Sequence, residues 1–246
     1  MKRVFSSFII LMIVTSLFST RAVAQNSIMY MNQVLDPLPG HAVDLENGVK
    51  AHNAKFHTTG EDKAYLFAIM TGPRSGQYAW LQGPMTYASL DKPLTKEHAA
   101  DWDKNVGAFC RNNGELRIFK RNEALTYNPA NEVIADNYLA RIFHGVTDQP
   151  QLLEAIGMIT KIYQTNKYAS ARRVYTNEFR TPDGESVMIV YPFKSFKEFE
   201  KSKGLPMDNL GKEMDKVHGA GGMKKFQDIM AAASAGWYDE VRTMVK

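Results

Sequence analysis

The sequence contains very little cysteine and, after its first residues, no long hydrophobic run. Cys110 is the single cysteine among 246 residues, which excludes an intrachain disulfide framework, a cysteine-rich zinc module and c-type haem attachment. No segment after residue 24 is apolar over the roughly 20 residues that a membrane-spanning helix needs, so we expect no membrane span. Low-complexity tracts are absent, and hydrophobic residues make up 44% of the chain, which indicates a globular protein with an ample core.

The first 24 residues have the pattern of a signal peptide. Lys2 and Arg3 precede a short apolar stretch, and Ala22-Val23-Ala24 has the small-x-small form that a signal peptidase accepts. A transmembrane anchor is the alternative, but serines and threonines interrupt the apolar stretch. Without a cysteine near the cleavage site, a lipoprotein anchor is also excluded. The pattern predicts removal of residues 1–24 and a periplasmic or secreted protein.

The positive charge of the chain does not indicate a nucleic-acid partner. The net charge is +4 and the isoelectric point is about 9.0, but Lys2, Arg3 and Arg21 belong to the expected signal peptide. Without them, 27 basic residues face 26 acidic ones. The pair Arg172-Arg173 would point to opposite faces of a strand and so forms no basic patch. We therefore expect no nucleic-acid binding.

Motifs for metal ions, nucleophiles and nucleotides are missing. Asp101, Asp103 and Asn105 resemble the start of a calcium loop, but its sixth position is Val106 instead of glycine. Histidines 52 and 57 do not have the spacing of the H-E-x-x-H zinc motif. No nucleophile elbow, P-loop or Rossmann glycine pattern occurs. These absences argue against hydrolases and nucleotide-dependent enzymes, and no metal site is predicted.

The rest of the chain divides into two halves with the same order of expected elements, β-α-β-β-α-β. The first half, residues 25–121, has strands at 28–35, 65–70, 78–81 and 116–120 and helices near 43–56 and 96–109. The second half, residues 137–246, has strands at 138–144, 171–178, 187–191 and 237–244, a helix near 149–165 and helical segments between 196 and 233. Residues 122–136 are expected to be a linker. Gly76 and Gly184 precede the third strand of each half, and Pro84 and Pro192 follow it.

This order resembles the ferredoxin-like dimeric α/β-barrel superfamily, here with two tandem units on one chain. The resemblance rests on element order and on no diagnostic motif. It implies an α+β fold in which the two units form a barrel within the chain, with further association into a homo-oligomer left open. The superfamily includes cofactor-independent monooxygenases, haem-binding and haem-degrading enzymes, isomerases and proteins of unknown function, so the fold alone does not define an activity.

The third strand of the first half carries a candidate ligand wall. Tyr78, Trp80 and Gln82 share one face of this strand, and Ala79 and Leu81 share the other. Large aromatic surface with hydrogen-bonding ends is typical of a ligand pocket. The alternative is that these aromatic side chains simply fill a core.

Two histidines are candidates for a polar role. His52 shares a helix face with Leu45, Val49 and Phe56, so it could act as a catalytic acid or base, or it could be an ordinary core residue. His144 ends the first strand of the second half, where it could contact a ligand or bind haem. Gly219 to Gly222 should break the last helical region, either as a plain turn or as a mobile flap.

These features predict an exported protein that binds a small apolar or aromatic molecule. An enzyme of the same fold, either a cofactor-independent monooxygenase or a haem protein, is the alternative. An envelope protein that uses a sheet edge for interaction is a third possibility. Whether the chain is an enzyme stays open at this point.

Overall fold

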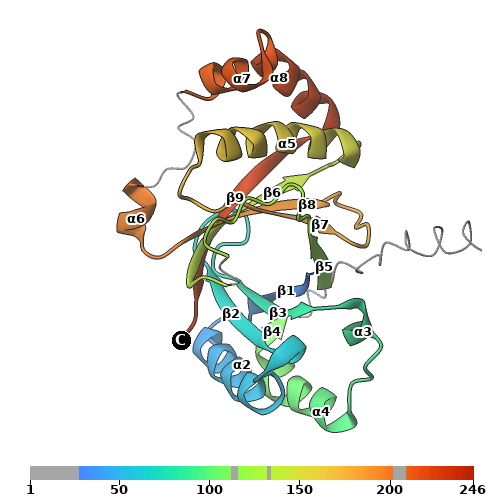
Figure 1. The fold of residues 1–246 in the computed structure, drawn as a ribbon. Coiled ribbons are helices and arrows are strands. Elements are labelled where there is room, and N and C mark those ends of the chain that lie inside the picture. Colours follow the sequence, from blue (N-terminus) through green and yellow to red (C-terminus); the bar gives the residue numbers. More distant parts are fainter. Residues whose placement is uncertain (1–27, 112–115, 132–133, 202–208) are drawn as a thin grey trace, which may run out of the picture.

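The computed structural model describes residues 28–111, 116–131, 134–201 and 209–246. The expected signal peptide, residues 1–24, lies outside the described residues. The described chain is a mixed α+β protein in which a closed antiparallel barrel is flanked by helices on two opposite sides (Figure 1).

Eight strands form the barrel. They are β1 (Met29–Pro37), β2 (Ala64–Ile69), β3 (Tyr78–Met85), β5 (Leu116–Arg121), β6 (Asn137–His144), β7 (Arg173–Asn177), β8 (Val187–Phe193) and β9 (Gly236–Met244). Their order around the barrel is β3-β2-β9-β6-β8-β7-β5-β1, and pairing of β1 with β3 closes the ring. A short strand, β4 (Cys110–Arg111), adds to the end of β1.

The two halves of the chain have equivalent strand orders. In the first half the order is β5-β1-β3-β2, and in the second half it is β9-β6-β8-β7. If the strands of each half are numbered in sequence, leaving out the short β4, both orders are 4-1-3-2. The halves join through two equivalent seams, β2 with β9 and β5 with β7. Each seam therefore pairs the second strand of one half with the last strand of the other.

The helices form one outer layer for each half (Figure 1). The first layer contains α2 (Ala42–Phe56), α3 (Tyr87–Leu90) and α4 (Lys96–Asn105), and the second contains α5 (Gln149–Asn166), α7 (Leu210–His218) and α8 (Gly222–Ala233). A short helix, α6 (Phe196–Lys201), follows β8. Within the described residues, none of the helices has the length and apolar character needed to cross a membrane.

Local sequence explains where the longer helices begin and end. Asp148 caps α5 by accepting a hydrogen bond from the backbone nitrogen of Gln151, and Thr95 caps α4 in the same way through His98. The helix α4 ends at Asn105, earlier than the expected residue 109, and a short 3-10 turn at Gly107–Phe109 follows. Gly219 and Gly221, both with positive φ, form the expected break between α7 and α8.

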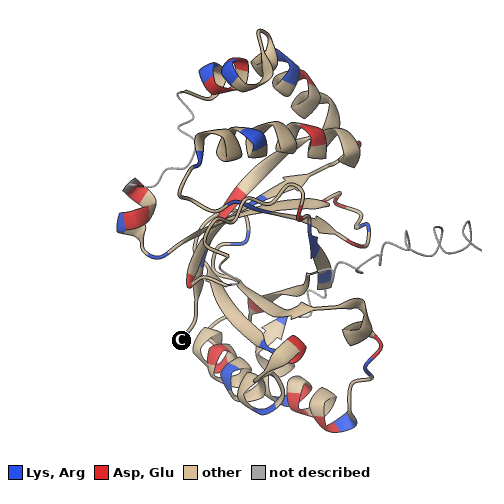
Figure 2. Ribbon diagram, viewed as in Figure 1, with Lys and Arg blue, Asp and Glu red and all other residues tan. Residues whose placement is uncertain are grey.

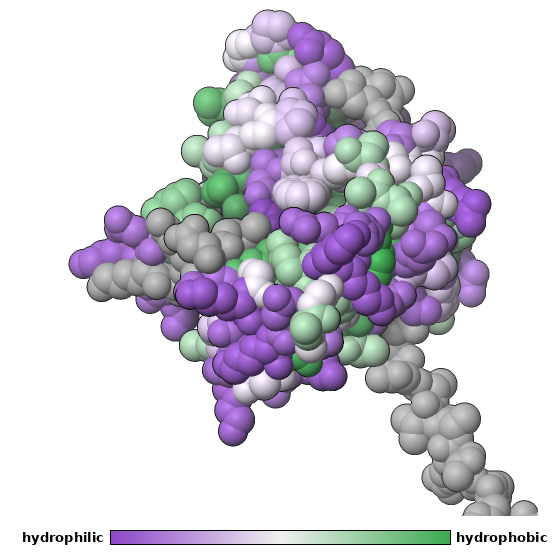
Figure 3. Space-filling model, turned by 90° about the horizontal axis from the view of Figure 1, so that it is seen from above, coloured by the Kyte–Doolittle hydropathy of each residue, from purple (hydrophilic) through white to green (hydrophobic). Residues whose placement is uncertain are grey.

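Side chains inside the barrel form one core, and the helices cover further cores on the outside of the sheet. Tyr30, Phe67 and Phe119 belong to the interior core, whereas Leu45, Val49 and Leu66 pack between α2 and the outside of the sheet. The helices carry acidic and basic residues side by side (Figure 2). The face in Figure 3 shows hydrophobic residues only in small areas separated by hydrophilic ones.

Candidate functional site

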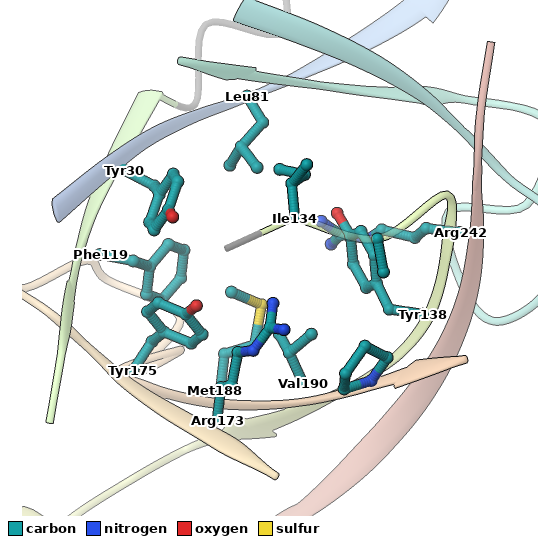
Figure 4. Close-up of a pocket in the computed structure, with 12 residues that line it drawn as sticks. Tyr30, Leu81, Phe119, Ile134, Tyr138, Arg173, Tyr175, Met188, Val190 and Arg242 are labelled. Carbon is teal, nitrogen blue, oxygen red and sulfur yellow. The ribbon is translucent and has the colours of Figure 1, made fainter. Parts of the chain in front are cut away.

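A pocket lies inside the barrel, with a cavity volume of about 40 Å³. Almost all strands contribute to its wall, and the connection between the two halves adds two residues (Figure 4). The lining residues are Tyr30, Leu81, Phe119, Ile134, Ala135, Tyr138, Arg173, Tyr175, Met188, Val190, Pro192 and Arg242. The segment expected to be a linker, residues 122–136, thus supplies part of the pocket.

Aromatic rings face one another across the pocket. Figure 4 shows Tyr30, Phe119 and Tyr175 along one side and Tyr138 on the other. The rings of Tyr30 and Tyr175 meet edge to face, with their centroids 5.9 Å apart. Such a wall offers both the flat faces and the edges of aromatic rings to a planar ligand.

The polar groups of the pocket are hydrogen-bond donors and cations. The hydroxyl group of Tyr30 is buried and has no hydrogen-bonding partner among the described residues. Burial raises the pKa of Tyr30, Tyr138 and Tyr175, so their phenols stay protonated at neutral pH. Arg173 and Arg242 are 3% and 1% exposed. The pocket can therefore donate hydrogen bonds to an anionic or oxygen-rich group.

A buried ionic network adjoins the pocket through Arg242. The guanidinium group of Arg242 donates to Glu240 at 2.9 and 2.6 Å and to the side chain of Asn32 at 3.2 Å. Glu240 also accepts a hydrogen bond of 2.6 Å from Arg74. Burial opposes the charge of Glu240, but Arg242 and Arg74 hold the pKa of this carboxyl below its ordinary value. The network fixes the position of Arg242 beside the pocket.

The predicted ligand wall of Tyr78, Trp80 and Gln82 lies outside this pocket. Tyr78 and Trp80 pack with α2 on the helix side of β3, and Gln82 approaches the backbone oxygen of Glu61 at 3.5 Å. The other face of the strand enters the barrel, where Leu81 lines the pocket. The alternation along β3 was predicted, but it does not identify which face is inside, because both faces are buried.

His52 lies in a cluster of three histidines between α2 and α4. Its Nε2 atom is 3.0 Å from Nε2 of His98, which is 3.1 Å from Nε2 of His57. His52 and His57 are buried. Burial lowers the pKa of His57 to about 4 and also lowers the pKa of His98. The prediction that His52 faces inward is confirmed, but its partners His57 and His98 were not predicted to meet it.

His144 lies apart from both the pocket and the histidine cluster. It ends β6 and pairs with Gly236 of β9, and its ring centroid is 6.1 Å from that of Tyr238. Neither His144, the candidate haem ligand, nor His52, the candidate catalytic residue, is among the residues that line the barrel pocket. These two histidines therefore do not provide the barrel pocket with an axial ligand for haem.

Inward residues of the barrel, among them Tyr30, Phe119 and Arg242 of the pocket wall, could have been found from strand periodicity. Tyr30 and Asn32, Arg117 and Phe119, and Glu240 and Arg242 each occur two residues apart on a barrel strand. This spacing places both members of a pair on one face. The predicted ligand wall lay on β3 alone, so these inward residues were not predicted.

Comparisons with known proteins support the fold. No protein-family model matches the chain, and no curated protein sequence matches it. Among solved structures, an anthrone oxidase-like protein is similar with a TM-score of 0.53 and 12% identity, over 90% of this chain and 92% of the other. A protein from Lactobacillus acidophilus NCFM named "putative monooxygenase" has a TM-score of 0.51 and 10% identity, over 90% and 94%.

A mutant chlorite dismutase from Candidatus Nitrospira defluvii is also similar, with a TM-score of 0.50 and 12% identity, over 91% of this chain and 94% of the other. These likenesses agree with the dimeric α/β-barrel architecture that the element order resembles. At such low identity they concern the fold alone.

Proposed function

We propose that this protein binds a small aromatic molecule with an anionic group inside its barrel. The observation that carries the proposal is the composition of the pocket wall, which combines four aromatic rings with two arginines and has no acidic residue among its twelve described members. Aromatic and aliphatic side chains with a few well-placed polar groups are typical of small-molecule sites.

The buried hydroxyl of Tyr30 supports an oxygen-bearing ligand. A buried donor without an acceptor costs about 1–3 kcal/mol, and within the described residues the Tyr30 hydroxyl has no acceptor. A carboxylate that accepts this hydrogen bond would remove that cost. Its negative charge would also be favourable near the guanidinium group of Arg173, whereas the charge of Arg242 is already paired with Glu240.

Simple binding fits the pocket better than base-dependent oxygenation. A cofactor-independent monooxygenase needs a group that accepts a proton from its substrate. The titratable residues on the described pocket wall are tyrosines and arginines, and burial raises the pKa of the three tyrosines. Monooxygenation is nevertheless a directly testable second function because of the fold.

Benzoate is a suitable probe for calorimetric titration. We expect it to bind the natural chain, and Leu81→Trp should weaken binding at least tenfold by filling the pocket. Tyr30→Phe removes one hydrogen bond to a charged group and should weaken binding roughly 10- to 100-fold. Leu94→Trp is the matched control, because Leu94 is 72% exposed, and should bind benzoate normally.

Several results would contradict the proposal or change it. Equal benzoate affinity in Leu81→Trp and the natural chain would place the ligand outside the pocket, and no binding by the natural chain would reject an aromatic carboxylate. Haemin serves as a second probe, and a Soret shift that Leu81→Trp abolishes would favour haem. If anthrone incubated in air gains one oxygen atom and loses two hydrogen atoms faster with the protein than without it, so that anthraquinone forms and the second oxygen atom of O2 leaves as water, the protein is a monooxygenase.

We also propose export of the chain and an internal duplication. Export is supported by the basic residues, apolar stretch and Ala22-Val23-Ala24 at the start of the sequence, and the mature protein should begin at Gln25. N-terminal sequencing of the protein expressed in a bacterial host tests this expectation. Duplication is supported by the shared 4-1-3-2 strand order, and superposition of Cα atoms from the two halves tests it.

A further inference from the structure

The three histidines between α2 and α4 form a cluster with converging nitrogen atoms. His52 lies in α2, His57 directly follows this helix, and His98 lies in the first turn of α4. One ring nitrogen from each histidine lies within 4.8 Å of the others. The shorter contacts, 3.0 and 3.1 Å, join Nε2 of His98 to the Nε2 atoms of His52 and His57.

The hydrogen bonds of the Nδ1 atoms of His52 and His57 determine which nitrogen of each ring carries the proton. Nδ1 of His57 lies 2.7 Å from the backbone oxygen of Asp62, which can only accept a hydrogen bond, so this Nδ1 is protonated. Nδ1 of His52 lies 2.8 Å from the Asp101 carboxylate and donates to it for the same reason. In the neutral rings, both Nε2 atoms therefore present lone pairs to His98.

His98 cannot satisfy both of these lone pairs. Its Nε2 atom carries at most one hydrogen, which can point to His52 or to His57 but is poorly directed toward both. A cation at the centre of the three Nε2 atoms would accept a lone pair from each ring. We propose that His52, His57 and His98 bind one divalent transition metal ion, for which Zn²⁺ is the best match.

The nitrogen spacing agrees with this metal. Zinc binds imidazole nitrogen at about 2.0–2.1 Å in tetrahedral geometry, which requires nitrogen atoms about 3.3 Å apart. The observed contacts of 3.0 and 3.1 Å need to lengthen by a few tenths of an ångström, and the nitrogen atoms of His52 and His57, which lie within 4.8 Å of each other, must adopt the same spacing. Three imidazoles also leave one tetrahedral position for water or a ligand.

The surroundings hold the ligands as metal sites usually do. The hydrogen bond from His52 to Asp101 corresponds to the carboxylate-histidine-metal arrangement that orients a ligand ring and increases its basicity. Phe56 stacks on His98, with ring centroids 4.5 Å apart, and Trp102 meets His52 edge to face at 5.0 Å. Such aromatic surroundings limit the access of water to the ion.

Close packing of the two helices brings the ligands together. Gly48 of α2 lies against the backbone of Asn105 in α4, and a Cβ atom at Gly48 would clash with the Asn105 oxygen. His52 lies one helical turn after Gly48 in α2, and it contacts Asp101, which lies one turn before Asn105 in α4. One turn further, His57 meets His98. The antiparallel helices therefore bring His98 into contact with both His52 and His57.

Metal binding can be tested on the full mature chain without an affinity tag. After treatment with a chelator, the protein should bind one Zn²⁺ per chain in native mass spectrometry, with a dissociation constant on the order of 1 μM or tighter. Co²⁺ should produce the visible bands of a tetrahedral site. His57→Gln and His98→Gln should each weaken Zn²⁺ binding at least 100-fold, whereas the control His41→Gln, changed at a half-exposed histidine beside α2, should bind normally.

The Asp101→Asn variant tests whether Asp101 orients the His52 ring without itself binding the metal ion. It should weaken Zn²⁺ binding about 10- to 100-fold while one ion per chain and the tetrahedral Co²⁺ spectrum are retained. Absence of Zn²⁺ and Co²⁺ binding by the natural chain would overturn the proposal. Unchanged affinity in folded His57→Gln and His98→Gln would overturn it too and identify a hydrogen-bonded cluster. Benzoate binding in the barrel is independent of this site and should persist in His98→Gln.

Discussion

Replacement of Glu240 by glutamine should strongly destabilise the protein. Glu240 is 0% exposed and Arg242 is 1% exposed, and two hydrogen bonds of 2.9 and 2.6 Å join them. Removal of one partner from a buried ion pair typically costs 3–5 kcal/mol, since the other charge stays buried without compensation. Glutamine keeps the volume and one acceptor oxygen, so we expect the lower end, about 3 kcal/mol.

Urea denaturation followed by circular dichroism measures this loss. For a protein of this size, a loss of about 3 kcal/mol corresponds to a fall in Tm of roughly 6–12 °C. Asp239→Asn is the matched control on the same strand. Asp239 pairs with Arg141 at 2.8 Å, but the two side chains are 35% and 27% exposed, so its loss should cost less than about 1 kcal/mol.

The same variant should change the response to acid. Because Arg242 and Arg74 overcome the effect of burial and lower the pKa of Glu240, its ionised form stabilises the folded state. This contribution is complete above the ordinary pKa of 4.5 and is lost as the pH falls through the lower folded-state value. Glu240→Gln should therefore lose less stability than the natural chain over that range. If Glu240→Gln and Asp239→Asn lower the free energy of unfolding equally at neutral pH, burial does not make the pair of Glu240 and Arg242 more important for stability than the exposed pair.

Three further substitutions test the local packing. Gly48→Ala should destabilise the protein by about 1–3 kcal/mol in urea denaturation, because the added methyl group would meet the Asn105 oxygen. Alanine otherwise favours helix formation, so a stabilised variant would contradict the close helix contact. Thr95→Ala should cost about 1 kcal/mol by removing the cap that accepts from His98, and no loss of thermal stability would contradict this role. Tyr30→Phe should raise the unfolding free energy by about 1 kcal/mol, since it removes a buried hydroxyl without a described partner; a clear loss would indicate an acceptor in the unliganded protein.

The sequence predicted the elements well because their periodicities are local. Alternating residues identified β6, and the helical spacing of Leu45, Val49 and His52 identified α2. The helix α4 was predicted to run to residue 109 because its apolar residues continue, yet it ends before Gly107. Local patterns gave no information about the pairing of β2 with β9 or of β5 with β7, since these partners lie in different halves of the chain.

The candidate sites were harder to predict because each depends on packing between distant segments. Tyr78 and Trp80 were correctly placed on one face of β3. Because both faces of this strand are largely buried, composition did not show which face packs against the helices and which enters the barrel. His98 and Asp101 lie on a largely polar helix, so its sequence pattern did not mark them as inward. The close packing of α4 against Gly48 of α2 brings them to His52.

The closed barrel makes the two halves dependent on each other. Each half has two edge strands, β2 and β5 in the first and β7 and β9 in the second, and all four are paired across the seams. A separate first half would expose both edges as well as the aromatic side chains of Tyr30, Phe67 and Phe119, which now pack in the shared interior. Exposed edges and apolar faces favour association. Because the second half satisfies both within the same chain, barrel formation needs no second copy, and a homo-oligomer would have to assemble through another surface, such as the outer helices.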